Sequence, residues 1–249
     1  MNKSTLSCAI ILLSLSLSLL PGPVTWTTQA QNQRPQNQAP PPPPTLGLEQ
    51  GYSEFDTPDF KLKLVKSSQT IAALQPKNSG TFDFTPADRL ERRQSDGFHH
   101  LGDITLRLRT GTEAWKDYDS AAVRKPVVPI STSGATLAAA DLTPTLPAGS
   151  PVQITRSWLV DNGRLVLRFE LKNKGTTPVQ IGALGIPVVF NNMITGRTLE
   201  QAHEICSFSD PYIGLDAGYL QVTRLSGRGP TLVVVPDGQT PFEAYQLLN

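Results

Sequence analysis

The chain has 249 residues, of which 39% are hydrophobic and 17% charged, with 22 basic and 21 acidic side chains. The net charge is +1 and no block of one sign stands out, so nucleic acids and anionic membrane surfaces are poor candidate partners. No phosphate-binding loop, zinc signature or nucleophile elbow is present. We therefore expect no cofactor and no bound metal, and the sequence identifies no catalytic residue.

The first 30 residues have the pattern of a secretory signal peptide. Lys3 precedes an apolar run over residues 9–20, which is too short to span a bilayer comfortably. Small residues before Gln31 offer a cleavage site. We expect residues 1–30 to be removed, which leaves no membrane span and places the protein outside the cytoplasm, either secreted or periplasmic. An uncleaved anchor is the alternative.

Residues 31–50 form a linker rich in Gln, Asn and Pro. Its five consecutive prolines, Pro40 to Pro44, favour an extended polyproline II conformation, and the segment cannot bury a core. The folded domain is therefore predicted over residues 51–249. That length is enough for one large β sandwich.

Alternation of apolar and polar residues predicts several strands in the first half of this domain. The segments are Phe60–Lys66 paired with Gln69–Leu74, a short strand at Phe82 and Phe84, and Asp103–Arg109 with Ile104, Leu106 and Leu108 inward. The lysines at 61, 63 and 66 suit an edge strand. A polar loop with one helical turn is expected between the second and third of these segments, over residues 86–100.

The second half begins with the strongest local signal in the chain. Two alternating runs meet at Asp161-Asn162-Gly163, a combination typical of a tight hairpin turn. We expect a three-stranded meander over 152–160, 164–172 and 179–190, one helix around 198–205, and a last pair of strands over 219–225 and 231–235. Together these segments predict an all-β fold of two packed antiparallel sheets.

Three polar clusters are candidates for function. In the first, His99 and His100 precede Asp103. These groups could bind a metal, but neighbouring residues of an extended chain point to opposite faces. We prefer the interpretation that one of the two imidazoles has a structural role. The third possibility is a contact with a ligand or at an interface.

The second cluster places Trp115 and Tyr118 among acidic residues. An exposed aromatic pair beside carboxylates suits a sugar, because aromatic faces cover C–H surfaces and carboxylates accept hydrogen bonds from hydroxyl groups. We therefore name Trp115 and Tyr118 as candidate carbohydrate contacts. In the alternative, Trp115 packs inside the sandwich and the acids are solvated.

The third cluster contains His203, Glu204, Asp210 and Tyr212, in a segment with a proline turn and no strand pattern. We predict a loop that lines a ligand site or a domain interface. A merely structural loop and an acid–base pair of Glu204 with Asp210 are the alternatives. Cys206, alone in the mature chain, is expected to be a buried thiol, because nothing in the sequence pairs it with a base.

The segments Ser53–Leu74, Phe98–Arg107 and Thr155–Pro187 resemble the N-terminal region of the DUF5695 family, and the resemblance covers about residues 50–249. That family is similar to six-hairpin glycosidases, and the resemblance implies an antiparallel β-supersandwich of the galactose-mutarotase-like kind followed by an (α/α)6 barrel. The barrel, which would supply the catalytic carboxylates, would lie beyond Asn249, so the chain would be a fragment or a truncated product.

Three functions follow as hypotheses. The first is a secreted sandwich domain that is accessory to the missing C-terminal barrel of a glycosidase-like protein and inactive alone. The second is a freestanding carbohydrate-binding module that depends on Trp115. The third is a structural cell-surface domain, in which alanine at His203, Glu204 or Asp210 has no consequence.

Overall fold

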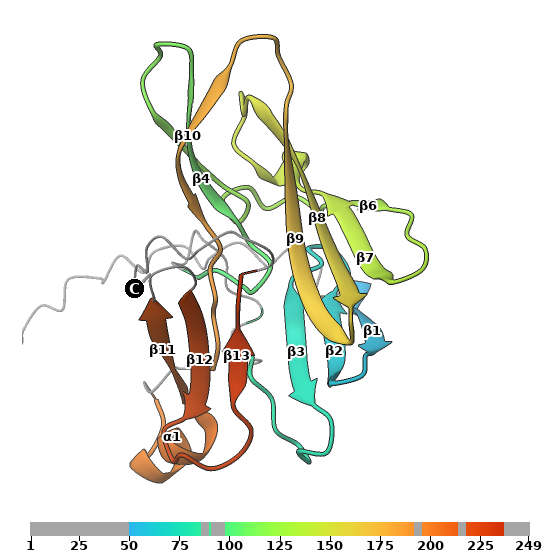
Figure 1. Ribbon diagram of the computed structural model, residues 1–249, viewed down its shortest axis with the longest axis vertical. Helices are drawn as coiled ribbons and strands as arrows, with labels where there is room; N and C mark the ends of the chain where they lie inside the picture. Colours follow the sequence, from blue (N-terminus) through green and yellow to red (C-terminus); the bar gives the residue numbers. More distant parts are fainter. Residues whose placement is uncertain (1–49, 86–89, 91–97, 192–195, 214–217, 237–249) are drawn as a thin grey trace, which may run out of the picture. The chain divides into compact units, whose positions relative to one another are not determined.

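The computed structural model describes residues 50–85, 90, 98–191, 196–213 and 218–236, with the backbone alone at 209–213 and 218. The predicted signal peptide and all but the last residue of the predicted linker lie outside the described residues. The described chain is built of antiparallel β-sheets (Figure 1) with a single α-helix, which confirms the predicted all-β, sandwich-like fold. No helix among these residues is long and apolar enough to cross a membrane.

Thirteen strands are present in the described residues, in four sheets. They are β1 (Tyr52–Asp56), β2 (Phe60–Val65), β3 (Ile71–Pro76), β4 (Thr105–Thr110), β5 (Lys116–Asp119), β6 (Val128–Ile130), β7 (Thr136–Asp141), β8 (Val152–Asp161), β9 (Arg164–Asn173), β10 (Val179–Gly185), β11 (Ser207–Ile213), β12 (Gly218–Arg224) and β13 (Leu232–Val234). The sheet orders are β1-β2-β3, β10-β4-β5, β6-β7-β8-β9 and β11-β12-β13.

The β8–β9 hairpin forms as the sequence predicts. Asn162 and Gly163 have φ of 48° and 81°, the positive values that a two-residue primed turn requires. The register then runs from Asp161 opposite Arg164 to Val152 opposite Asn173. The predicted strand pairs β2–β3 and β12–β13 are also confirmed.

The expected three-stranded meander is wrong at its third strand. β10 leaves β9 and pairs with β4, with Val179 opposite Thr110 and Gly185 opposite Thr105. The connection between β9 and β10 is longer than a tight turn, so it can carry the chain to another sheet. In this connection the Asn173 side chain donates to the Thr177 carbonyl oxygen, and the Gly111 amide donates to the Pro178 carbonyl oxygen.

Four further expectations need correction. β2 is the central strand of its sheet, so Lys61 and Lys63 mark a solvent-facing side and not an edge. Phe82 and Phe84 lie in irregular chain, with their rings packed edge to face 4.8 Å apart. The segment 207–213, expected to be a loop, is the strand β11 paired with β12. β1, β5, β6 and β7 were not predicted.

The helix α1 (Leu199–Ile205) confirms the predicted helical segment. The Thr198 hydroxyl accepts from the Gln201 amide, and the Gln201 side chain accepts from the Thr198 amide, a reciprocal cap that fixes the helix start. Only Ala202 is buried, whereas Leu199 is 76% exposed. The helix therefore packs through one small side chain.

Two apolar cores share the four-stranded sheet. One core joins β8 to β4 and β5, and the other joins β8 to β2, β3 and β12. On one face of β8, alternate side chains reach both cores: Val152 and Ile154 lie in the first, and Trp158 lies in the second. Arg156, between them on the same face, is 1% exposed. The sandwich is therefore continuous along β8, with one buried cation at its middle.

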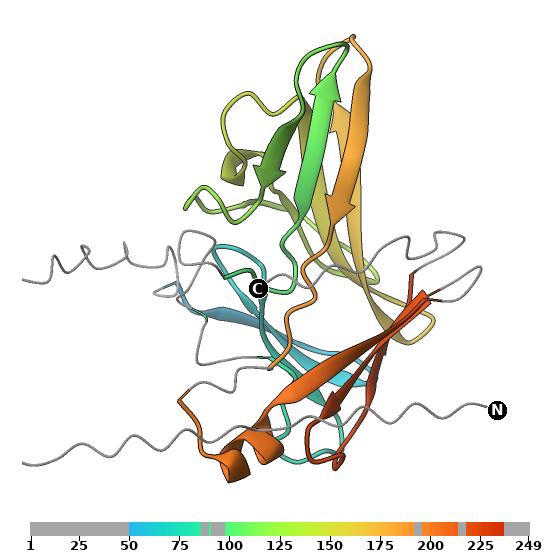
Figure 2. The same cartoon turned by 90° about the vertical axis from the view of Figure 1, so that its left-hand side faces the viewer.

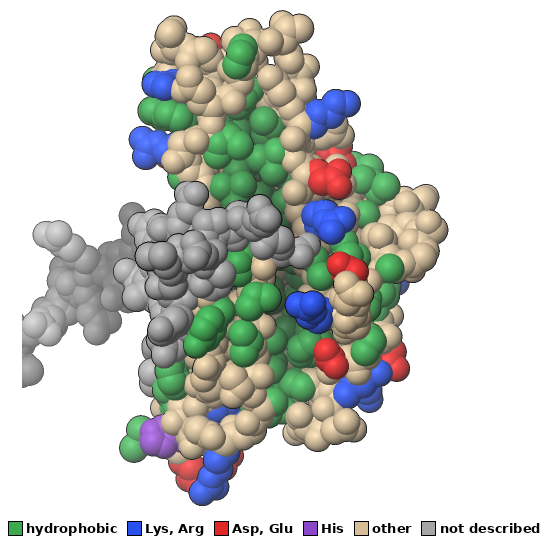
Figure 3. Space-filling view, in the orientation of Figure 1, with side chains coloured by type: hydrophobic (Ala, Val, Ile, Leu, Met, Phe, Trp, Pro, Cys, Tyr) green, Lys and Arg blue, Asp and Glu red, His purple; other side chains and the backbone are tan. Residues whose placement is uncertain are grey.

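The first core is open along one side, between the edge strands β9 and β10. Register places Ile181 opposite Leu108 and Leu184 opposite Leu106, so all four point to the inner face. Leu106 and Leu108 are buried, but Ile181 is 54% and Leu184 49% exposed. Figure 3 shows hydrophobic side chains along this gap between β10 and β9. We call it the apolar seam.

Asp141, at the end of β7, supports the corner that follows it. Its carboxylate accepts from the amide and hydroxyl of Thr143 and from the Gln153 side chain. Burial alone would raise the pKa of Asp141, but these hydrogen bonds and the charge of Lys174 outweigh it and lower the pKa. A lowered folded-state pKa means that Asp141 stabilises the fold at neutral pH and loses this contribution as the pH falls.

We therefore expect Asp141→Asn to lower the free energy of unfolding by about 1 kcal/mol at pH 7. The deficit should shrink as the pH falls below the reference value of 3.8, because the carboxylate of the unfolded chain then takes up a proton, and it should vanish below the lowered pKa of the folded state. Urea denaturation at pH 7 and in acid measures both. Asp161→Asn, at the exposed turn of β8 and β9, is the control and should change little. An equal deficit at both pH values would contradict the prediction.

Candidate functional site

The outward face of the β10-β4-β5 sheet carries a set of interacting polar and aromatic side chains. The three strands lie side by side in the upper part of Figure 2, with this face toward the viewer. Side chains alternate across a strand, so Leu106 and Leu108 point into the core while Thr105, Arg107 and Arg109 point outward. The outward residues of β5 and β10 flank these three.

Trp115, which directly precedes β5, lies across the sheet at one end of this face. Its ring centroid is 4.4 Å from the Arg109 guanidinium carbon. The indole reaches Gly182 of β10, where a Cβ atom would lie 2.7 Å from its Cζ3. Gly182 stands at an irregularity of register between Ile181 and Ala183, a bulge that leaves the space for the ring. Trp115 is therefore half-buried and held in place.

The two outward arginines of β4 have different surroundings. Both Nε and Nη2 of Arg109 donate to the Gln180 side-chain oxygen, so the fork of Arg109 is oriented between Trp115 and Gln180. Arg107 is more exposed, and its Nε lies 3.9 Å from the Asp117 carboxylate, which is too far for a hydrogen bond. Asp117 itself has a side chain that is 80% exposed.

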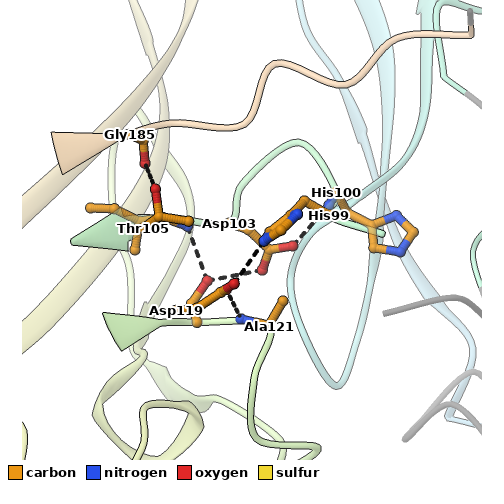
Figure 4. Close-up of polar contacts among 9 residues, drawn as sticks. His99, His100, Asp103, Thr105, Asp119, Ala121 and Gly185 are labelled. Carbon is orange, nitrogen blue, oxygen red and sulfur yellow. Dashed lines mark hydrogen bonds and ion pairs between the residues drawn. The ribbon is translucent and has the colours of Figure 1, made fainter. Parts of the chain in front are cut away.

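A histidine–carboxylate pair lies at the other end of the same face. His99 Nε2 is 2.7 Å from Asp119 Oδ2, with side-chain exposures of 17% and 19%. The second Asp119 oxygen accepts from the Ala121 amide. The Thr105 hydroxyl donates to the Gly185 carbonyl oxygen. Figure 4 shows His99 turned toward Asp119, while the ring of His100 points away from it.

Asp103 fixes the loop that brings His99 to this position. Its carboxylate, 1% exposed, accepts from the His100 amide at 2.8 Å and from the Ser120 hydroxyl at 3.0 Å. Ser120 in turn accepts from the Ile104 amide. These bonds tie the start of β4 to the end of β5. The first cluster of the sequence thus contributes His99 to the surface, and it uses Asp103 for support.

No group of three or more potential metal ligands gathers among the residues that the structure describes. One hollow of about 30 Å3 lies beside Asp103 and Arg156, and another of about 400 Å3 lies beside the segment 143–150. Of the candidate contacts whose side chains are described, Trp115, Tyr118, His203 and Glu204, none lines either hollow. Arg107 and Arg109, on the outward face of the sheet, line neither of them.

Tyr118 is not part of an exposed aromatic pair, contrary to the expectation from the sequence. It is 5% exposed in the first core, and its hydroxyl donates to the Gly149 carbonyl oxygen. The reason is that residues 116–119 form a strand, whose alternation sends Trp115 and Asp117 outward and Tyr118 inward. Trp115 is instead joined on the surface by Arg109.

The third cluster is divided between a helix and a strand. His203 and Glu204 lie exposed on α1. The backbones of Asp210 and Tyr212 pair in β11 with Gln221 and Tyr219, and their side chains lie outside the described part of the structure. Cys206, at the helix end, is 0% exposed, as predicted for a buried thiol.

The sequence did not identify Arg109 and Gly182 as neighbours of Trp115, or Gln180 as the partner of Arg109. Arg109 and Gln180 are 71 residues apart, and no local pattern connects them. A signal existed for Arg109, because the alternation of 103–109 already placed it on the outward face of a strand. The bulge at Gly182 was visible only as an isolated glycine in a predicted strand, which is typical of bulges and of close approach.

Comparison with known proteins gives a family and a similar fold. A sequence profile of a family of unknown function, DUF5695, matches residues 63–249. No curated protein sequence matches the chain. A solved structure of a polysaccharide lyase is similar over 71% of this chain, with a TM-score of 0.55 and 17% sequence identity. At that identity the similarity shows the fold, and the chain spans about a quarter of the lyase's length.

Proposed function

The chain belongs to the DUF5695 family, and from that premise we propose that it is a secreted or periplasmic accessory β domain of a carbohydrate-active protein. A further segment, folded as an (α/α)6 barrel, supplies the catalytic carboxylates. The β domain cleaves no glycan alone. Its role is to support that barrel and to contribute surface for the carbohydrate.

Two likenesses support the carbohydrate-active class. The sequence resembles a family that is similar to six-hairpin glycosidases. Independently, the fold is similar to part of a polysaccharide lyase that is much longer than this chain. Fold alone does not specify an activity, so the reaction and its substrate belong to this proposal.

The observation that carries the accessory role is the apolar seam. Edge strands of soluble proteins are ordinarily short, charged or covered, yet β9 runs over ten residues beside β10, with Ile181 and Leu184 about half exposed. Half-buried Phe169 and Leu171 of β9 pack on the same core. A contiguous exposed apolar surface of this kind typically marks an interaction site. In this proposal the barrel, or the chain that leads to it, covers the seam.

Two measurements test the proposal. The purified chain should release no reducing ends and no unsaturated products from a panel of plant and microbial polysaccharides, and cleavage by the chain alone would overturn the accessory role. Genes of relatives that match the same family profile should encode a helical-hairpin barrel after the position of Asn249. A family in which no relative carries such a barrel would also refute it.

The seam gives a sharper prediction. A barrel domain taken from a longer relative should bind the chain, and Ile181→Asp or Leu184→Asp should weaken that binding about tenfold or more, because each buries a charge in an apolar contact. Val128→Asp is the matched control, since Val128 is 52% exposed on β6, away from the seam. Isothermal titration calorimetry measures the three affinities. Equal weakening by all three variants would argue against the seam as the interface.

A freestanding carbohydrate-binding module is the second candidate function. It is favoured by the outward face of the β10-β4-β5 sheet, which carries Trp115. In that case the chain binds a polysaccharide with full affinity in the absence of any barrel. A structural cell-surface domain is the third hypothesis, and it predicts neither glycan binding nor binding of the barrel.

A further inference from the structure

We propose that the outward face of the β10-β4-β5 sheet binds an acidic polysaccharide, with Trp115 as the apolar platform and Arg107 and Arg109 as the groups that recognise sugar carboxylates. This inference rests on the proposed carbohydrate-related function and names its ligand class and binding residues.

The platform is built by the backbone and is not an incidental surface aromatic. The indole of Trp115 lies across the sheet because β10 has a glycine at its bulge, and a Cβ atom at residue 182 would approach two of the indole carbons to 2.7 and 2.9 Å. Bulges commonly re-aim a side chain next to a binding site. A half-buried aromatic ring fixed in this way offers C–H-compatible surface to a sugar with little conformational entropy to lose on binding.

Arg109 is oriented for a carboxylate. A guanidinium has five N–H donors in a planar fork, and two of its nitrogens are committed to the Gln180 oxygen. Donors remain on Nη1 and Nη2, while the stack on Trp115 and the Gln180 contact limit the rotation of the side chain. Such a preoriented fork suits bidentate recognition of a carboxylate. The Gln180 amide nitrogen adds a donor for a hydroxyl group.

Arg107 extends the positive charge along the same strand. It lies two residues from Arg109 on the same face, about 7 Å along β4, and it makes only a 3.9 Å ion pair with Asp117. Two cations beside one aromatic ring favour a ligand with repeated negative charge over a neutral one. Two carboxylates on this face oppose such a ligand. Asp119 is largely buried and paired with His99, whereas the exposed carboxylate of Asp117 would face the sugar carboxylates.

The test uses the full chain and pairs of polymers that differ only in charge. Polygalacturonate, alginate and hyaluronan are each compared with their carboxyl-reduced forms by affinity electrophoresis and calorimetry. We expect at least one acidic polymer to bind, its reduced form to bind at least about tenfold more weakly, and the affinity to fall with added salt. If no acidic polymer binds, or if the reduced forms bind equally well, the proposal is wrong.

Variants locate the site. Trp115→Ala, Arg109→Gln and Arg107→Gln should each weaken binding of the acidic polymer about tenfold or more, as expected for lost stacking or lost hydrogen bonds to charge. Asp117→Asn should strengthen it, a change of opposite sign that a general loss of structure does not produce. Arg164→Gln, in the β8–β9 hairpin, is the charge-matched control. Circular dichroism and thermal melting confirm that each variant is folded.

The outcomes separate this inference from the proposed function. Binding that survives Trp115→Ala and Arg107→Gln would refute the assigned surface and leave the accessory role intact. Cleavage of a polysaccharide by the chain alone would refute the accessory role, whatever the variants do to binding.

Discussion

Arg156→Met is expected to lower the free energy of unfolding by about 2–6 kcal/mol, because it leaves two backbone carbonyls without their donor at about 1–3 kcal/mol each. Arg156 Nη1 donates to the Gly102 carbonyl oxygen at 2.6 Å, and Nη2 donates to the Ser68 carbonyl oxygen. Methionine fills a similar volume but offers no donor. The two carbonyls belong to loops far from β8 in the sequence, so the substitution removes long-range links.

The loop that connects β2 to β3 shows why the loss is large. Its carbonyl oxygens at Ser67, Ser68, Gln69 and Thr70 accept, in order, from the Val127 amide, the Arg156 guanidinium, the Trp158 indole and the Val65 amide. Each of these four backbone carbonyl oxygens therefore has a donor, as native structures require of buried backbone groups. The Trp158 donor is 2.9 Å from its acceptor, so two neighbouring side chains of β8 hold this loop on the sheet.

Urea denaturation followed by circular dichroism measures the effect, with Arg164→Met as the control. Arg164 is exposed at the start of β9, and its replacement should change stability by less than about 0.5 kcal/mol. Arg156→Lys should be intermediate, since an ammonium group keeps the charge but cannot reach both carbonyls in the fork geometry. A loss below about 1 kcal/mol for Arg156→Met would show that these bonds do not hold the loop.

Arg156 also shows how much of a fold can be predicted from the alternation of residues along a strand. Counting by twos from Val152 places residues 154, 156 and 158 on one face, and that face is buried. The sequence therefore contained an arginine at a core position, which is a signal that a buried cation needs partners. Its partners were not predictable, because they lie 54 and 88 residues away in sequence and are backbone groups of irregular loops.

Local sequence patterns predicted where strands occur better than they predicted which strands pair with one another. The Asn162-Gly163 turn set the β8–β9 register, because a tight hairpin leaves no other choice. The partner of β10 depended on which sheet had an unpaired edge, and β4 lies far earlier in the chain. β11 was missed for a different reason: its residues 207–213 include Ser207, Ser209, Asp210 and Pro211, and pairing with β12 stabilises the strand despite its weak local preference.

The candidate site was likewise predicted in its local features but not in its long-range contacts. Trp115 was identified from the types of residue around it. The strand at 116–119 was not predicted, and for that reason Tyr118 was wrongly expected on the surface. Once the strand is recognised, alternation alone assigns Trp115 and Asp117 to one face and Tyr118 to the other. The contribution of β10 required the tertiary fold, because Gly182 meets Trp115 and Gln180 meets Arg109 only through the β4–β10 pairing.

Gly102→Ala is the second substitution with a large expected effect. Gly102 has φ of +113°, a conformation that residues with a Cβ atom rarely adopt and that costs about 1–3 kcal/mol in strain. A Cβ atom would also lie 3.0 Å from Trp158 Cζ2 and 3.1 Å from Arg156 Nη1. Both neighbours are buried and hydrogen-bonded, so neither can move without loss. Overpacking of this kind adds about 1–3 kcal/mol.

The total expected loss in the free energy of unfolding is therefore about 2–6 kcal/mol, and Gly134→Ala measures a backbone cost without the crowding. Gly134 also has a positive φ, +63°, but no atom lies within 4 Å of the position that an alanine Cβ would take there. Alanine at this position should cost only the backbone term, about 1 kcal/mol. Equal losses at Gly102 and Gly134 would show that crowding against Trp158 and Arg156 contributes nothing. A loss at Gly102 that exceeds the loss at Gly134 by more than about 2 kcal/mol, the largest difference that the two backbone terms allow, would establish that the first residues before β4 are packed directly against the centre of β8.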